Sequence, residues 1–279
     1  MKLHSAGNAD YVHSFLRDKD VILLSTAFQE IRKRPDLLSN LEDTLATANP
    51  YLVSDVTRFW YADIFNFLNV DGVRFNSLET YPLLAGFIDK LIGNTEFENA
   101  CATAEKEVSD LFLEQIEPDV GADLDERDLC VVIWDRVNKY SKEFFRIGIP
   151  PADCHAHNFP AFFVHYYTYY YRYIKNATAV PELNDFIDLA NSIAAPYCSH
   201  YYCEQKFANV LRNSVQGRQP PSPWRIIKNS YRKGIVGREV YEDAKRKRDH
   251  LDRRSHLLPG TKIFSYSEMK NQILNGKNA

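Results

Sequence analysis

The chain has 279 residues, of which 45% are apolar and 25% charged, the balance of an ordinary globular domain. It has no apolar run long enough to cross a membrane and no signal-peptide core, so a membrane partner is not expected. Its five cysteines are scattered and odd in number, which argues against a disulfide framework and favours a cytoplasmic location.

The net charge of −3 conceals an asymmetry along the chain. Residues 205–255 hold 14 Lys or Arg and 5 Asp or Glu, whereas the remainder holds 20 and 32. Such a basic stretch indicates a nucleic-acid-binding face. A helix face that is merely solvated gives the same pattern, and both interpretations stay open.

The predicted elements are mostly helical, and apolar periodicity defines them. The chain is expected to form one domain over 1–279, with 35–180 as a mostly helical insertion and 224–258 as a basic helical segment. In chain order, the expected elements are a strand and helix in 19–32, helices at 36–47, 54–68, 78–92 and 96–116, an acidic loop at 117–128, helices at 129–145 and 161–174, a helix from 184, a strand at 197–203, a helix at 207–211, a basic helix at 236–257, and a strand and helix in 261–274.

Residues 183–211 are the most informative segment, because a helix, a short aromatic strand and a second helix follow one another with acids at both joints. Asp185 and Asp188 lie three residues apart, on one side of the first helical turn. Glu204 stands where the chain leaves the strand. Strand exits and helix starts line the binding crevice of an open α/β sheet, so these acids are expected to converge on a divalent cation.

This segment resembles the later half of PIN-like nucleases, in which an acid begins a helix and a hydrophobic strand ends in Asp or Glu. Residues 19–32, with Glu30 on the helix, resemble the family's second acidic motif, and residues 261–274 resemble its ending. Ser199 stands where one variant of the pattern carries Asp. The residues that match that variant are Asn184, Asp185, Asp188, Pro196, Tyr197, Cys198 and Glu204.

The resemblance implies a helix-rich, three-layer α/β fold in which 20–24, 197–203 and 261–265 pair in a small parallel sheet. It also implies a metal-dependent ribonuclease in which Mg²⁺ or Mn²⁺ activates the attacking water. RNA and an inhibitory protein are the implied partners. The implied metal ligands, and hence the catalytic residues, are Glu30, Asp185, Asp188 and Glu204.

Two departures from the family pattern predict a weakened or inactive nuclease. The family's first strand ends in an Asp that anchors the metal, but this chain begins MKLHSAGNADYVHSFL, which is too polar and too short for that strand. Ser199 is the second departure. The alternative function is a non-catalytic helical module that binds protein or RNA, and a purely helical fold would favour it.

Three other clusters each have two interpretations. The tyrosine-dense stretch 162–173 either stacks bases or, as we prefer, packs into the core. Six cations near the end of the basic segment are expected to contact phosphates: Lys245, Arg246, Lys247, Arg248, Arg253 and Arg254. Six soft or borderline ligands suit zinc but lack an established spacing, so buried structural cysteines are favoured: Cys154, His155, His157, Cys198, His200 and Cys203.

Overall fold

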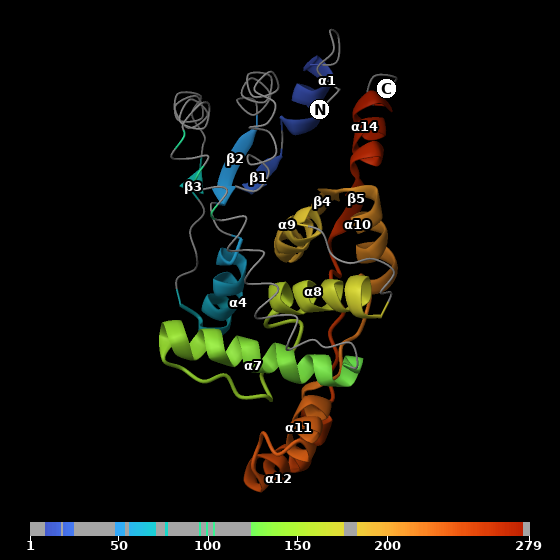
Figure 1. Ribbon diagram of the computed structural model, residues 1–279. Helices are drawn as coiled ribbons and strands as arrows, with labels where there is room; N and C mark the ends of the chain where they lie inside the picture. Colours follow the sequence, from blue (N-terminus) through green and yellow to red (C-terminus); the bar gives the residue numbers. More distant parts are fainter. Residues whose placement is uncertain are drawn as a thin grey trace.

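The protein is a mixed α/β structure built mainly from helices (Figure 1). The computed structural model describes residues 9–17, 19–24, 48–53, 56–70, 76–77, 95, 99, 103, 124–175 and 183–275. The expected helices at 36–47 and 78–92, and most of the one at 96–116, lie outside these residues.

The described elements follow the predicted order over most of the chain. They are α1 (Ala9–Leu16), β1 (Asp20–Leu24), β2 (Asn49–Val53), α4 (Arg58–Leu68), β3 (Asn76–Ser77), α7 (Glu126–Phe145), α8 (Pro160–Tyr169) continued by a π-helical turn (Tyr170–Ile174), α9 (Leu183–Asn191) continued by a 3-10 helix (Ser192–Tyr197), β4 (His200–Cys203), α10 (Gln205–Val210) continued by a π-helical turn (Leu211–Val215), α11 (Pro223–Arg232), α12 (Arg238–Arg246), α13 (Arg248–Leu251), β5 (Lys262–Ser265) and α14 (Tyr266–Asn275).

The strands form two small sheets, each with one parallel pair. β4 pairs with β5 in parallel, as expected for these two segments, and the register runs from His200 opposite Lys262 to Cys203 opposite Ser265. β1 pairs in parallel with β2, and β2 pairs antiparallel with β3. The described strands therefore do not form the expected single sheet of 20–24, 197–203 and 261–265. The three-layer PIN-like arrangement stays a hypothesis.

The difference arises in the range 35–180, which was expected to be helical but supplies β2 and β3. The sequence of β2 is NPYLV, a short apolar run whose Pro50 is poorly suited to a helix interior. Leu52 and Val53 are buried, so pairing with β1 places this run in the core. The fold is therefore mixed α/β, and a purely helical fold is excluded.

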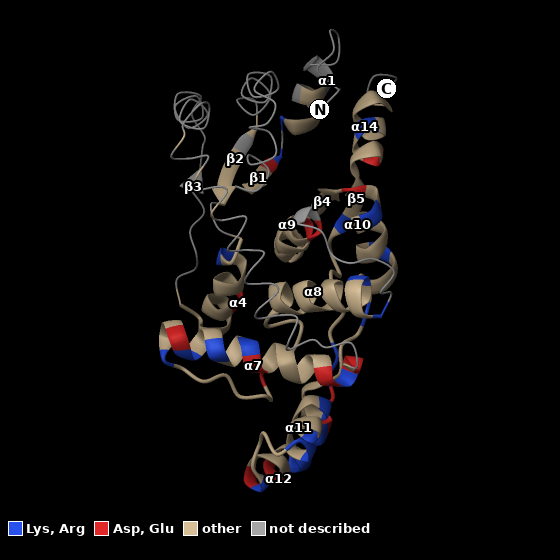
Figure 2. Cartoon of the chain, in the orientation of Figure 1, with Lys and Arg blue, Asp and Glu red and all other residues tan. Residues whose placement is uncertain are grey.

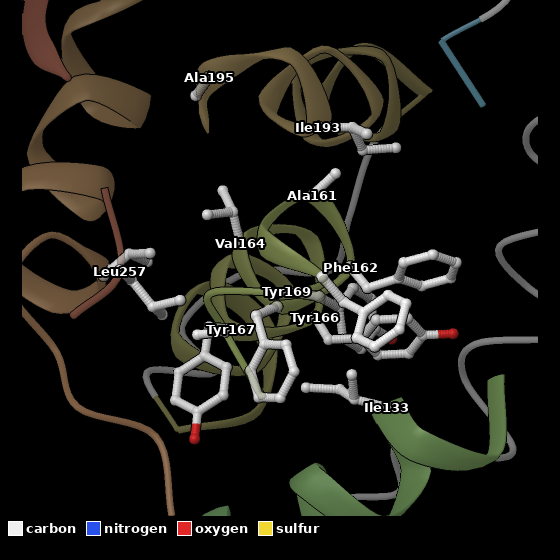
Figure 3. Close-up of a cluster of buried hydrophobic side chains, with 14 of the residues drawn as sticks. Ile133, Ala161, Phe162, Val164, Tyr166, Tyr167, Tyr169, Ile193, Ala195 and Leu257 are labelled. Carbon is white, nitrogen blue, oxygen red and sulfur yellow. The ribbon is translucent and has the colours of Figure 1, made fainter. Parts of the chain in front are cut away.

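Helix α8 lies at the centre of the hydrophobic core (Figure 3). Every residue from Ala161 to Tyr169 is buried, because the helix is apolar or aromatic on all sides. The tyrosine-dense stretch is thus mainly a core element, as preferred from the sequence. The side chains labelled in Figure 3 come from α8 (Ala161, Phe162, Val164, Tyr166, Tyr167 and Tyr169) and from its neighbours (Ile133, Ile193, Ala195 and Leu257).

A buried carboxylate caps this central helix. Pro160 occupies the first turn, and the preceding residue, Phe159, has no side-chain group that could cap the helix. Asp63 of α4 takes that role: its Oδ2 accepts hydrogen bonds from the amides of Ala161 at 2.8 Å and Phe162 at 3.3 Å. The hydroxyl of Tyr197 donates to its Oδ1 at 2.6 Å. Three segments far apart in sequence are joined at this point.

Helices α11 and α12 extend beyond α7, away from α8 (Figure 1), and α13 packs on both of them. α11 packs on α7, and α12 packs on α11. A small separate core of Trp224, Ile227 and Ala244 holds these helices together. The expected continuous helix over 236–257 is wrong, since α12 ends at Arg246 and α13 is a single short turn. Like charges at Lys245 and Arg248, three residues apart, disfavour a continuous helix here.

No helix among the described residues is long and apolar enough to cross a membrane.

Candidate functional site

Of the four expected metal ligands, Asp185 is already engaged by a cation. It lies in the first turn of α9, and the guanidinium of Arg172 donates a hydrogen bond from Nη2 to its Oδ1 at 2.6 Å. Both side chains are only about one-fifth exposed, at 21% for Arg172 and 22% for Asp185. A metal ion at Asp185 would have to compete with this charge-assisted hydrogen bond.

Asp188 and Glu204 lie near the end of β4, where strand exit and helix start were expected to meet. Burial and, to a smaller extent, the carboxylate of Asp188 raise the pKa of the Cys203 thiol to about 12. Arg212 opposes that effect, and Glu204 and Glu268 add to it. Cys203 is the last residue of β4. Acids from α9, from the β4–α10 junction and from α14 therefore all act electrostatically on the end of β4.

Glu268 is an acid of this neighbourhood that the sequence analysis did not single out. The Arg212 guanidinium and then the amide and hydroxyl of Ser265 lower its pKa to about 2. Ser265 precedes α14, and its amide donates to Glu268 Oε2 at 2.6 Å, while the Glu268 amide donates to Ser265 Oγ at 3.3 Å. This is a capping box, and the Ser-x-x-Glu pattern was its available sequence signal. The role of Glu268 is therefore structural: together with Ser265 it caps the N-terminus of α14.

Within the part of the chain that the structure describes, no three His, Cys, Asp or Glu side chains are placed to hold a metal ion. This applies to Asp185, Asp188 and Glu204 and to the six potential zinc ligands, all of which are described. The zinc alternative therefore gains no support. Glu30 lies outside the described residues, so its expected approach to Asp185 and Glu204 stays a prediction.

A strongly basic cleft lies instead between α7, α11 and α13. Its volume is about 360 Å³. Arg225, Lys228 and Arg232 project from one face of α11, because they occupy positions i, i+3 and i+7. Figure 2 shows Lys and Arg residues, in blue, along α11. The residues that line the cleft are Arg127, Trp224, Arg225, Lys228, Asn229, Arg232, Arg248 and Asp252.

The lining carries five cations and one acid. The single acid, Asp252, accepts a hydrogen bond from the Ser222 hydroxyl. The guanidinium of Arg248 lies over the Trp224 ring, with its Cζ 5.8 Å from the ring centroid. Like charges gathered in a concave site focus a positive potential, which favours a polyanion over a neutral ligand.

A second cleft of about 300 Å³ adjoins the first and shares Arg127 and Arg225 with it. Its charges are nearly balanced. Arg127 also faces Asp125 at 3.7 Å, and Tyr171 donates to Glu126 at 2.8 Å. The excess positive charge therefore belongs to the first cleft. The residues that line the second are Asp125, Glu126, Arg127, Gln219, Pro221, Arg225 and Arg254.

The six cations expected to contact phosphates divide into three groups. Arg248 lines the first cleft and Arg254 the second. Lys247 and Arg246 face Asp243 at 2.8 and 3.3 Å, and their hydrogen bonds lower the pKa of that carboxyl. Lys245 and Arg253 are exposed and line neither of these two clefts.

The sequence analysis missed the larger part of the basic cleft. Arg225, Lys228 and Arg232 show a regular helical spacing, RIIKNSYR, that was available as a signal. Arg127 has no such signal, because it sits in an acidic stretch about a hundred residues earlier and joins the cleft only through the packing of α11 on α7.

A scan against protein-family models found no match to this chain, and searches of curated proteins and of solved structures found none either. The PIN-like resemblance is therefore carried by the quoted residues alone.

Proposed function

We propose that this protein binds RNA by holding its phosphate backbone in the basic cleft between α7, α11 and α13. The observation that carries the proposal is the convergence of five cations from three helices on one concave site with a single acid. Phosphate contacts supply most of the affinity of nucleic-acid binding without requiring a particular sequence. The charge alone does not distinguish RNA from DNA; the PIN-like resemblance favours RNA.

The salt dependence of binding tests this proposal quantitatively. For single strands, each neutralised phosphate contributes about 0.7 to the slope of log affinity against log salt. Five contacts give a slope of about −3.5, which is roughly a hundredfold loss of affinity between about 50 and 200 mM salt. Replacing Arg225, Lys228 and Arg248 with Gln should reduce the slope to about −1.4, a loss of roughly sevenfold over the same range.

A matched control uses the two cations that face Asp243. Arg246→Gln with Lys247→Gln removes charge from the same helical segment but not from the cleft lining. We expect the control to keep a slope near the wild-type value in a fluorescence-anisotropy titration of a labelled single-stranded RNA. Equal slopes for wild type and cleft variant would refute the proposal, and a control as weak as the cleft variant would show that net charge alone acts.

Metal-dependent RNA hydrolysis of the PIN-like kind is the second candidate function. The gathering of Asp188 and Glu204 near the end of β4, beside the parallel strand β5, supports it. Glu30, Asp185, Asp188 and Glu204 would hold Mg²⁺ or Mn²⁺, and the ion would supply an activated water. We expect weak turnover at best, because the Asp185 carboxylate already accepts a hydrogen bond from Arg172 and Ser199 offers no carboxylate. An inhibitory protein partner also stays a prediction.

Cleavage of a fluorescent single-stranded RNA in the presence of Mn²⁺ tests this second candidate. Asp185→Asn is the informative variant, and Asp249→Asn, an exposed acid on α13, is the control. Robust turnover by the unchanged chain that Asp185→Asn abolishes would contradict the expected weak site and show that the acids present suffice.

A further inference from the structure

Three aromatic rings stack on one another beside the basic cleft. Tyr241 of α12 stacks on Trp224 of α11 with ring centroids 5.7 Å apart, and on Tyr231 of α11 with centroids 4.4 Å apart. The ring planes differ by 28° and 13°. Trp224 and Tyr231 are seven residues apart on one helix, which is about 10.5 Å along its axis. Tyr241 therefore lies between them, and the three rings form a ladder along α11.

The two ends of this ladder have different surroundings. The Trp224 end is buried, since Trp224 is only 8% exposed and the Arg248 guanidinium lies over its ring. The Tyr231 end is open, since Tyr231 is 37% exposed. Ile235 and Val240, in the turn after α11 and the first turn of α12, are 51% and 44% exposed. The Tyr231 end thus presents partly exposed aromatic surface, and exposed apolar side chains follow it along the chain.

The position of Tyr231 relates this open ring to the cleft. Arg232, the next residue, lines the cleft, and so does Lys228, one helical turn earlier. A sugar-phosphate backbone that contacts Arg225, Lys228 and Arg232 would run along α11 toward the Tyr231 end of the ladder. The positive cleft beside the ring matches a polyanion that also carries flat apolar groups. Single-stranded nucleic acid combines these two properties.

We propose that Tyr231 is a base-stacking site, on which an unpaired base packs while the adjoining phosphates lie in the basic cleft. This inference rests on the proposed RNA-binding function and narrows its substrate to single strands. The bases of a duplex are already stacked and paired, so they offer no free face to Tyr231. Packing by Tyr241 holds the Tyr231 ring in place before binding, which reduces the entropy lost when the base stacks.

The experiment compares three labelled ligands by fluorescence anisotropy: an unstructured single-stranded RNA decamer, an abasic ribose-phosphate strand of equal length, and a duplex of the same sequence. Tyr231→Leu should weaken binding of the natural strand about tenfold and leave the abasic strand unchanged. Tyr231→Phe, which keeps the ring, should bind like the wild type. Tyr266→Leu removes a more exposed tyrosine from α14 and serves as the control, with no expected effect.

A second variant keeps the test decisive if Tyr231→Leu disturbs the packing of α12. Tyr231→Trp preserves the stack and adds a fluorophore, whose emission the natural strand should quench and the abasic strand should not. Equal weakening of natural and abasic strands by Tyr231→Leu, no quenching in Tyr231→Trp, or a wild-type preference for the duplex would each overturn the inference. Wild-type protein that binds both single strands equally well would overturn the inference and leave the cleft proposal standing. Wild-type protein that binds neither strand would overturn both.

Discussion

Acid should destabilise this protein through a buried histidine in its central helix. His165 of α8 has no exposed surface, and its ring packs edge-on against Trp60 and Tyr166, with centroids 5.2 and 5.4 Å away. Burial lowers the pKa of His165 to about 3, against a smaller opposing effect of the Leu189 backbone. The native core therefore holds a neutral imidazole.

The sign of the pH dependence follows from the direction of this pKa shift. An unfolded histidine binds a proton below about pH 6.5, whereas native His165 does so only near pH 3. The unfolded state thus holds the extra proton between these values, so stability is fully present above about pH 6.5 and is lost as the pH falls toward 3. The loss attributable to His165 is about 2 kcal/mol between roughly pH 7.5 and 5, a large part of a typical domain's stability.

Chemical denaturation followed by tryptophan fluorescence measures this effect. His165→Phe keeps a planar ring in the core but cannot titrate, so its free energy of unfolding should fall by about 2 kcal/mol less than that of the wild type over the same pH range. The comparison uses the change with pH, because replacing a fully buried side chain alters the stability of the variant at every pH. His250→Phe, at an exposed position on α13, should keep the wild-type profile. Identical pH profiles for wild type and His165→Phe would refute the reasoning.

Two further predictions concern a helix cap and a thiol. Asp125→Ala should lower the free energy of unfolding by about 1 kcal/mol, because the Asp125 carboxylate accepts a hydrogen bond from the Arg127 amide at 3.1 Å and caps α7. Asp125→Asn retains an acceptor, so it should lower the free energy of unfolding by less in the same denaturation experiment. Iodoacetamide should label Cys203 far more slowly than a free thiol at about pH 8, because burial and the nearby acids raise the pKa of that thiol to about 12. Mass spectrometry of the labelled peptides decides this, and fast labelling of Cys203 in the native protein would contradict the burial of this thiol.

The sequence predicted local elements well and their partners less well. The helix of residues 183–191, the strand that ends at Cys203 and the parallel pairing of β4 with β5 are all present. The partner of β1 was wrong, because strand pairing depends on tertiary packing and the short run of β2 carries little pattern of its own. The break at Lys247 had only a weak sequence signal, the like charges at Lys245 and Arg248, since neither glycine nor proline lies near it.

The candidate site shows the same limit in chemical terms. Charge composition placed a positive region within 205–255, and the sequence analysis singled out six cations at 245–254 without distinguishing among them. Only the structure distinguishes Arg248, which lines the cleft, from Lys247, which faces Asp243. The role of Asp185 also depends on a partner, Arg172, that spacing within the segment could not reveal.

The two candidate functions occupy different parts of the molecule. In Figure 1, β4 and α10 lie on one side of α8, whereas α11 lies beyond α7 on the other side. The acids near Cys203 and the cations of the basic cleft are therefore separated by the central helix and its core. Changes to the cleft cations should alter RNA affinity without altering any metal affinity of the acids, and changes to Asp188 or Glu204 should do the reverse. Binding and hydrolysis are consequently separable hypotheses, and the failure of one leaves the other to be judged on its own residues.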